Sequence, residues 1–328
     1  MVWQEGMPSS HHSHSGQFCK HAVGSLEEVV LEAIRQGFET YSLTEHVPRY
    51  RSEDLYPEEN GLALQELATQ FDDFVTEATR VRHLYADQIN LLVGLETEYI
   101  SRGDLDGLAE VLDRYKDSID HIVGSIHHVN GIPIDFDKDT FDRCLASIPA
   151  PLDREGDMEH RRQEAYLELY FDAQYEVLQR FHPEVVGHLD LCRLYTPSVH
   201  LPDYPSAWEK LERNIKFGIE YGALFEANAS ALRKGWDASY PGYEVLKLIL
   251  YHGGRIALSD DSHGPHAVGL NYGRMRQYLM RAGVEEIWVL ERTEERNAGG
   301  RRTAPVRVRG DWWDHGFWAG REDSAVKA

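Results

Sequence analysis

Histidines and carboxylates in short, evenly spaced pairs are the residues of this chain best suited to chemistry. His12 and His14 stand two apart in HSH, and Asp261 and His263 stand two apart in DSH. On an extended strand, residues two apart point to the same side, so the two side chains of each pair can coordinate one metal ion. The chain holds 17 histidines. Imidazole and carboxylate groups together suit zinc, iron and manganese.

Further candidate ligands follow other apolar segments. They are His21, His46, Glu96, His127 and His188. Together with the two pairs they exceed the capacity of one ion, which predicts two or three divalent ions with the carboxylate of Glu96 as a bridge. We expect Glu96, His188 and Asp261 to be the catalytic members of the set.

Several of these positions have a similar neighbour, and spacing alone does not decide between the two. The neighbours are Glu98 beside Glu96, His128 beside His127, Asp260 beside Asp261, and His11 beside His12. A lone histidine is more often a hydrogen-bonded loop or core residue than a ligand. The joint placement of the candidates after successive apolar runs is what favours a metal site.

Other catalytic schemes have less support. The chain has no G-x-S-x-G elbow, no Walker A run and no Rossmann G-x-G-x-x-G. Cys19 stands near His21 and offers an alternative nucleophile, although small buried cysteines are common.

The elements that position these residues alternate between strand and helix. Apolar runs rich in β-branched residues cover 38–43, 89–99, 119–128, 184–190, 222–230, 254–263 and 286–291. Alternation with helix-length amphipathic segments predicts a parallel sheet. The sites of parallel α/β folds lie at the carboxyl ends of the strands, and we expect the candidate ligands to meet there.

Helix signals complete this pattern. Ser25 and Glu28 have the spacing of a capping box, and Gly37 follows the same segment. Longer helices are predicted over 61–87 and 158–182. Because no repeat divides the chain, we expect one domain over 1–295 and an Arg- and Trp-containing extension over 296–328.

Composition narrows the class of protein. The 328 residues are 42% hydrophobic and 27% charged, which indicates a globular fold. The net charge of −21 disfavours nucleic acid and acidic membranes as partners. Three scattered cysteines predict a reducing compartment, and the N-terminus resembles no signal peptide. We therefore expect a cytoplasmic protein; the oligomeric state stays open.

In order along the chain, these motifs resemble the PHP (polymerase and histidinol phosphatase) superfamily, and within it the histidinol-phosphate phosphatases. The matching segments are HSH, TEH, GLE, GSIHH, GHLD and DSH, and they extend from about residue 9 to residue 275. The resemblance implies a distorted, TIM-like (β/α)7 barrel with a metal cluster at the strand ends. It implies hydrolysis of L-histidinol phosphate, and it favours Glu96, His127 and Asp261 over their neighbours.

Hydrolysis of a phosphate monoester requires cationic groups around a dianion. Arg193 follows His188, and Arg233 follows the run 222–230, so we expect both to bind the phosphate of a small-molecule ester. A PHP-type phosphodiesterase or nuclease, another small-molecule phosphatase, and a noncatalytic metal-binding barrel are the alternatives. The acidic balance counts against a nuclease.

Selection of histidinol phosphate needs groups that read its imidazole and its amine. The segments 47–61 and 130–142 join acidic side chains to aromatic ones. Asp54, Asp135 and Asp137 are the candidates for this contact.

Overall fold

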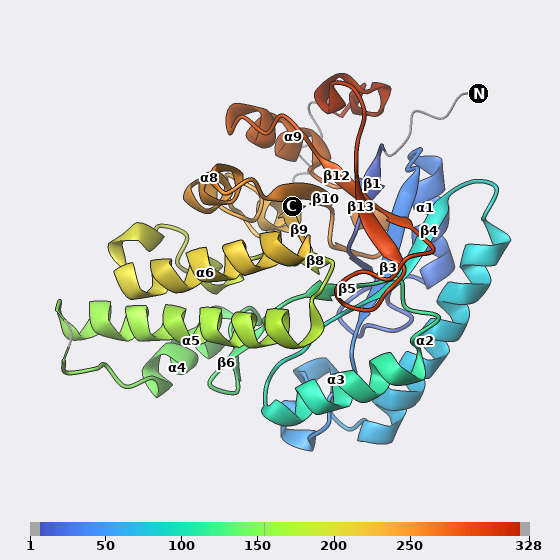
Figure 1. The fold of residues 1–328 in the computed structure, drawn as a ribbon. Helices are drawn as coiled ribbons and strands as arrows, with labels where there is room; N and C mark the ends of the chain where they lie inside the picture. The colour runs from blue at the N-terminus through green and yellow to red at the C-terminus, as the bar shows by residue number, and fades with distance from the viewer. Residues whose placement is uncertain (1–6, 154, 322–328) are drawn as a thin grey trace.

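A central parallel sheet alternates with helices along the chain in the computed structural model, which describes residues 7–153 and 155–321 (Figure 1). Within these residues seven strands form the sheet. In spatial order they are β1 (Ser9–Ser10), β3 (Thr40–His46), β4 (Asn90–Glu96), β5 (His121–Gly124), β8 (Val185–Val186), β9 (Leu224–Asn228) and β10 (Arg255–Ser259). Each strand runs parallel to its neighbours.

The two edges of this sheet meet and close it into a barrel. The backbone N–H of His11 donates to the carbonyl oxygen of Leu258 at 3.2 Å, which joins the end of β1 to β10. Just beyond, β2 (Ser13–His14) pairs in parallel with β11 (Ser262–His263). The predicted (β/α)7 barrel is confirmed, and its closure brings the first and last histidine motifs side by side.

Helices cover the outside of the barrel. The capping box predicted at Ser25 and Glu28 is present at the start of α1 (Leu26–Arg35). The two long predicted helices are α2 (Leu64–Leu84) and α5 (Met158–Phe181). The remaining helices are α3 (Arg102–Arg114), α4 (Lys138–Ser147), α6 (Pro205–Tyr221), α7 (Ser230–Arg233), α8 (Tyr243–Tyr251) and α9 (Tyr272–Arg281). In Figure 1, α5 and α6 lie side by side and extend away from the barrel.

Short elements complete the chain. A hairpin of β6 (His128–Val129) and β7 (Ile132–Pro133) follows β5. Single 3₁₀ turns lie at Ser52–Asp54, Pro57–Glu59, Leu191–Arg193, Leu201–Asp203, Pro265–Ala267, Trp312–Asp314 and Gly316–Trp318.

The amino-terminal end of the barrel is sealed by the C-terminal part of the chain. The run 286–291 leads into a strand, β12 (Trp288–Arg292), which pairs antiparallel with β13 (Thr303–Arg307). Its one pairing with the barrel sheet among the described residues is a single parallel bridge between Ile287 and Ile256 of β10. Leu290 packs against a buried apolar layer of barrel residues, and its backbone N–H donates to His11 Nε2 at 3.1 Å. The hairpin therefore includes residues on both sides of the predicted boundary at 295.

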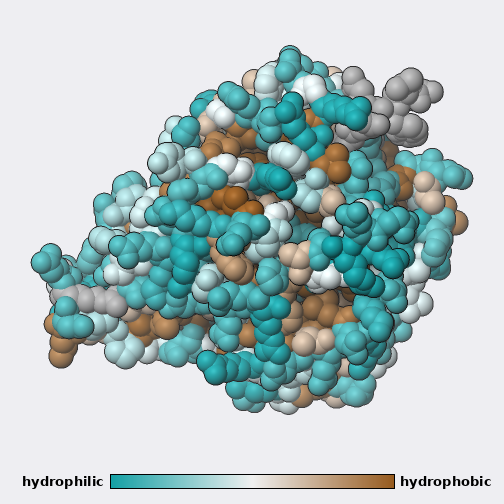
Figure 2. Space-filling model, viewed as in Figure 1, coloured by the Kyte–Doolittle hydropathy of each residue, from teal (hydrophilic) through white to brown (hydrophobic). Residues whose placement is uncertain are grey.

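The surface is largely hydrophilic in the view of Figure 2, in keeping with the net charge of −21. Within residues 7–153 and 155–321, no helix has the length and apolar character needed to cross a membrane.

Candidate metal centre

Glu96, the last residue of β4, lies at the centre of a group of histidines. Its side chain is buried. Oxygen Oε2 lies 3.1 Å from His12 Nε2, 3.2 Å from His14 Nε2 and 3.2 Å from His46 Nδ1. Oxygen Oε1 lies 3.0 Å from His188 Nε2 and 3.2 Å from His127 Nε2. The two oxygens thus face different sets of imidazoles, which is the arrangement expected of a bridging carboxylate.

The histidines reach Glu96 because they all follow strands at the carboxyl end of the barrel. His12 lies just before β2 and His14 ends it. His46 ends β3, and His127 and His188 follow β5 and β8. The extended backbone at HSH turns both side chains the same way, and their Nε2 atoms are 3.1 Å apart. Before His188, a side chain at Gly187 would lie 2.7 Å from Val123 Cγ1, so only glycine fits this close passage.

Asp261 and His263 complete the far side of the cluster. Asp261 Oδ1 is 3.8 Å from His12 Nε2 and 3.7 Å from His14 Nε2. His263 Nδ1 lies 3.0 Å from the carbonyl oxygen of Asp261. The backbone of Asp261 is left-handed, with φ of 47°. Such a conformation costs on the order of 1–3 kcal/mol for a residue other than glycine and is common at functional sites.

His21 lies at the edge of the group. Its ring centre is 5.0 Å from that of His263 and 5.6 Å from that of His46. The His21 side chain lies at the exposed rim of the group. Partial desolvation there, together with the neighbouring His46 and His14, lowers the pKa of His21 to about 3, so its ring is neutral.

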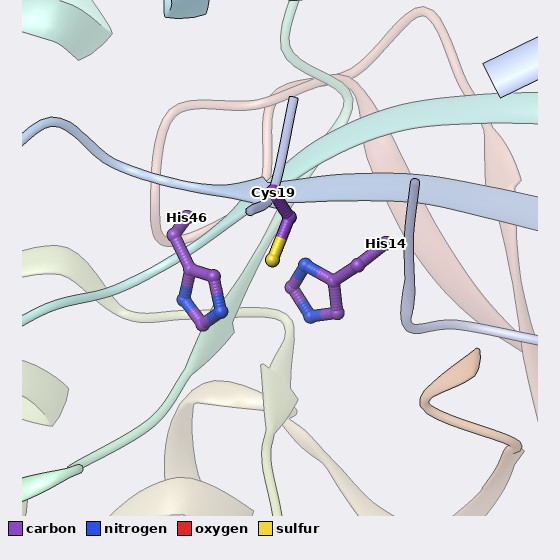
Figure 3. A group of neighbouring side chains, drawn as sticks. All are labelled: His14, Cys19 and His46. Atoms are coloured by element: carbon purple, nitrogen blue, oxygen red, sulfur yellow. The ribbon is translucent and has the colours of Figure 1, made fainter. Parts of the chain in front are cut away.

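Cys19 lies against the same edge. Figure 3 shows its sulfur between the rings of His14 and His46, and it is 3.2 Å from His21 Nε2. Burial raises the pKa of the Cys19 thiol above its usual value, and Glu45 raises it further. A protonated thiol is a weak nucleophile, so the alternative of catalysis by Cys19 loses support.

For three of the four ambiguous pairs, the structure shows which of the two side chains faces the histidine cluster. Asp260 accepts hydrogen bonds from Ser10 Oγ and Tyr41 OH and from the backbone N–H groups of Ser262 and Gly269. Asp261, not Asp260, faces the histidines.

The other two neighbours also point elsewhere. The ring of His11 faces the sealed end of the barrel, with Nδ1 3.0 Å from the Leu258 carbonyl oxygen. His128 starts β6, and its Nδ1 lies 3.7 Å from Glu98 Oε2, whereas His127 Nε2 lies 3.2 Å from Glu96 Oε1.

Glu98 remains close to the cluster. Its Oε1 lies 3.1 Å from His46 Nδ1, and its Oε2 lies 3.4 Å from His127 Nδ1. It also accepts a hydrogen bond from Tyr56 OH at 3.2 Å. Glu96 meets more of the candidate ligands, but His46, Glu98 and His127 also form a group close enough to hold an ion.

Two buried carboxylates that the sequence reasoning missed contact the paired histidines. Glu226 in β9 lies 2.9 Å from His12 Nδ1, and Glu45 in β3 lies 3.3 Å from His14 Nδ1. Neither has a ligand-like spacing to another candidate. The available signal was a carboxylate inside an apolar strand segment such as LFEAN, because buried charges are rare unless they are paired.

The electrostatics of the group favour bound cations. Burial opposes ionisation, but His12, His127 and His46 hold the pKa of Glu96 well below its usual value. Its carboxylate is therefore charged. Two imidazole nitrogens, His127 Nε2 and His188 Nε2, lie 3.4 Å apart. This matches the separation of about 3.3 Å between two ligands of a tetrahedral zinc ion, so the residues fit divalent metal ions.

A pocket of about 480 Å³ opens beside these residues. It is also lined by three cationic or titratable side chains, Arg233, Lys234 and His266. A second group of lining residues contains acidic and aromatic side chains: Tyr56, Glu58, Asp135 and Phe136. The pocket can therefore accept a ligand that carries an anionic and a cationic end.

The two predicted phosphate-binding arginines occupy different surroundings. Arg233 lines the pocket, and its Nη1 and Nη2 lie 3.4 Å from the Asp261 carbonyl oxygen. Arg193 is buried, with Nη2 2.6 Å from Asp190 Oδ2 and Nη1 paired with Glu244. The structure thus brings Arg233, but not Arg193, into the pocket lining.

The three predicted specificity residues also separate. Asp135 lines the pocket. Asp54 is buried in a pair with Arg51 at 2.6 Å, and Asp137 caps α4 by accepting from the backbone N–H of Thr140 at 2.7 Å.

Comparison with known proteins agrees with this geometry. The PHP domain family matches residues 10–230, which include the barrel strands through β9. The chain belongs to this family.

Relatives narrow the family to one branch. A probable histidinol-phosphatase of Schizosaccharomyces pombe is 44% identical over 294 residues, covering 89% of this chain and 92% of the relative. A histidinol-phosphatase of Saccharomyces cerevisiae is 33% identical, covering 87% of this chain and 92% of the relative. Together these matches support the histidinol-phosphatase branch of the family.

A solved structure has a similar fold. A histidinol phosphate phosphatase of Lactococcus lactis, in complex with zinc, L-histidinol and phosphate, aligns with a TM-score of 0.58 at 21% identity. The alignment covers 89% of this chain and 97% of that one.

Proposed function

We propose that this chain is a metal-dependent phosphomonoesterase that hydrolyses L-histidinol phosphate to L-histidinol and phosphate, a step of histidine biosynthesis. The observation that carries the proposal is the position of Glu96, whose two oxygens face two sets of imidazoles beside a pocket with cationic and acidic ends. The identity to histidinol-phosphatases over most of the chain supports the choice of substrate.

The cluster would hold two or three divalent ions of zinc, iron or manganese. The proposed ligands are His12, His14, His21, His46, Glu96, His127, His188, Asp261 and His263. Close groups within this set are His12 with Glu96 and His188, and His12 with His14 and Asp261. When bound, such ions lower the pKa of a coordinated water and neutralise a phosphate dianion.

The chain's own residues would orient the ester. Arg233 can donate two parallel N–H bonds to phosphate oxygens, and Lys234 adds a second positive charge at the same pocket. We place Glu96, His188 and Asp261 as the catalytic residues. The net reaction adds water across the bond between phosphorus and the alkyl oxygen, which leaves as the alcohol.

The alcohol part of the substrate would lie against the acidic and aromatic lining. Asp135 offers a carboxylate to the cationic amine of histidinol, and Phe136 and Tyr56 offer ring faces to its imidazole. A pocket that only bound phosphate would not need this second group of residues.

A direct assay tests the proposal. Protein loaded with a divalent metal is expected to release phosphate from L-histidinol phosphate faster than from an aryl phosphate, and to leave a phosphodiester intact. Preferred cleavage of the diester would favour a nuclease or phosphodiesterase. Stoichiometric metal binding without any hydrolysis would favour a noncatalytic barrel.

The setting proposed for this activity is the cytoplasm, with a small molecule rather than nucleic acid as the partner. The cysteines Cys19, Cys144 and Cys192 are all free and buried, as in proteins of reducing compartments. A net charge of −21 repels polyanions at long range.

A further inference from the structure

Glu226 is a buried carboxylate in β9 that faces two of the candidate metal ligands at once. It is 1% exposed. Oxygen Oε1 lies 2.9 Å from His12 Nδ1. Oxygen Oε2 accepts from the backbone N–H of His188 at 2.7 Å and from Asn228 Nδ2 at 2.9 Å. Both contacts of Oε2 have Glu226 as the acceptor, and an ionised Glu226 can only accept from His12 as well.

These contacts determine which nitrogen of His12 can bind a metal. A histidine must be neutral to bind a metal ion. An ionised carboxylate has no proton to donate, so the single proton of a neutral His12 ring belongs on Nδ1, which faces Glu226. The lone pair then lies on Nε2, the atom that is 3.1 Å from Glu96 Oε2 and 3.1 Å from His14 Nε2. The other tautomer would direct an N–H group at these ligands and block coordination.

We infer that Glu226 is a positioning residue of the metal centre, which holds His12 in the metal-binding tautomer and fixes the backbone of His188. This inference rests on the proposed metal dependence of the same site. One carboxylate of β9 thereby ties together a ligand just before β2 and a ligand after β8, two segments that lie far apart in the chain. Outer carboxylates of this kind change metal affinity by about 10–100-fold when they are mutated.

Replacement by glutamine gives the sharpest test, because it keeps the shape and inverts one contact. A glutamine amide has one accepting oxygen and one donating NH₂ group. At the Oε2 position the NH₂ group would meet two donors, the His188 N–H and Asn228 Nδ2. At the Oε1 position the NH₂ group would meet only one donor, His12 Nδ1. The NH₂ group is therefore expected to face His12 Nδ1 and to shift the imidazole proton of His12 to Nε2.

Glu45 provides an internal comparison, since it repeats the arrangement at His14. Its Oε1 accepts from Ser15 N at 2.8 Å and from Ser15 Oγ at 2.8 Å, and its Oε2 faces His14 Nδ1 at 3.3 Å. The Ser15 hydroxyl can rotate to accept a hydrogen bond, whereas a backbone N–H cannot. Glu45→Gln is therefore expected to weaken metal binding less than Glu226→Gln.

Glu184 supplies a matched control at the other end of the barrel. It is also buried, and it accepts from the backbone N–H of Ile122 at 2.9 Å, but its ion pair is with Arg301 rather than a site histidine. Glu184→Gln thus reports the general effect of neutralising a buried carboxylate in this fold.

The experiment measures zinc affinity by competition with a chromophoric chelator, for wild type and the variants Glu226→Gln, Glu45→Gln and Glu184→Gln. Unfolding of each in excess chelator reports the stability of the metal-free fold. We expect about 10–100-fold weaker zinc binding for Glu226→Gln, a smaller change for Glu45→Gln and wild-type affinity for Glu184→Gln. NMR of the zinc-loaded wild type should show an imidazole proton on His12 Nδ1, and Glu226→Gln should lack it.

Zinc affinity of Glu226→Gln within about twofold of wild type would overturn the inference. An equal loss in Glu184→Gln would also overturn it, because the effect would then be general destabilisation. The readouts do not depend on turnover. A wild-type protein that binds zinc but leaves histidinol phosphate intact would contradict the proposed function alone.

Discussion

At the scale of single residues, Glu96 is the group on which the proposed chemistry depends most. Its carboxylate is the only contact that the nitrogens of His14 and His188 share among the ion pairs described for residues 7–153 and 155–321. Glu96→Gln removes the charge without changing the shape, so we expect weaker metal binding and a loss of turnover exceeding about 100-fold. Metal content and kcat, measured on the same preparation, check this expectation.

Asp260→Asn is the control for that variant. Asp260 is also buried and lies beside a proposed ligand, but its contacts are to Ser10, Tyr41 and backbone N–H groups. Metal content should therefore survive in Asp260→Asn. If Glu96→Gln retained full metal content and turnover, Glu98 would become the better candidate for the bridge.

The two arginines predicted from the sequence give a second test at this scale. Arg233→Ala should lower kcat/KM by roughly 10–1,000-fold, as expected for loss of a charge-assisted contact, while metal content and stability persist. Steady-state kinetics with histidinol phosphate measure this effect.

Arg193→Ala is expected to behave differently, because the change leaves Asp190 buried without its partner. Breaking a buried ion pair costs about 3–5 kcal/mol of unfolding free energy, which urea titration measures. A selective fall in kcat/KM at unchanged stability would instead support the original assignment of Arg193 to the phosphate.

At the scale of elements, we propose that the segment between β7 and α4 binds the alcohol part of the substrate. Asp135→Asn should depress activity on histidinol phosphate more than on an aryl phosphate, since only the former carries an ammonium group. The ratio of kcat/KM values for the two substrates is the measurement.

Asp137→Asn lies in the same segment and serves as its control. Asparagine caps helices as well as aspartate does, so α4 should persist and the ratio should stay at the wild-type value. Equal losses on both substrates in Asp135→Asn would assign this segment to the fold or the metals instead.

Elements with their own local signals were predictable from the sequence, and those that depend on the closed barrel were not. α1 carries its capping box, and α2 and α5 carry long amphipathic patterns. β1 has only two residues, Ser9 and Ser10, and no apolar run marks it. The run 286–291 has the pattern of a barrel strand, yet β12 pairs with β13, and only Ile287 bridges β10, because the edges β1 and β10 of the barrel sheet already meet.

The candidate site shows the same division. The spacing within HSH and DSH predicts the ligands in these motifs. Glu226, in contrast, acts through a contact with His12 that spans more than 200 residues of chain. Arg193 has the right position after a strand, but its ion pairs with Asp190 and Glu244 turn it away from the pocket lining. Pairings of this kind follow from the closed fold and have no local pattern.

At the scale of the whole molecule, metal ions should stabilise the fold as well as serve the reaction. Ligands from both ends of the chain meet in the cluster, and an ion that binds only the folded state raises the free energy of unfolding. Chelator should abolish activity and lower the melting temperature, and a divalent metal should restore both. Full activity in metal-free protein would contradict the metal dependence.

The C-terminal residues pack against the barrel domain. We propose that residues 296–328 form an extension of the barrel domain rather than a second domain. Arg301 pairs with Glu184 at 2.6 Å, and Trp312 and Trp318 are buried. These contacts tie the described part of the extension to the sealed end of the barrel.

The pairing of β2 with β11 also sets the time at which the site can exist in the cell. Ser13 pairs with Ser262, so the first histidine motif is made long before its partner leaves the ribosome. At about 5–20 residues per second, the nascent chain spends many seconds with its early imidazoles exposed and the pocket unbuilt. Binding of an ion by the full ligand set therefore has to follow synthesis of Asp261 and His263, and an ion bound earlier contacts only some of its final ligands.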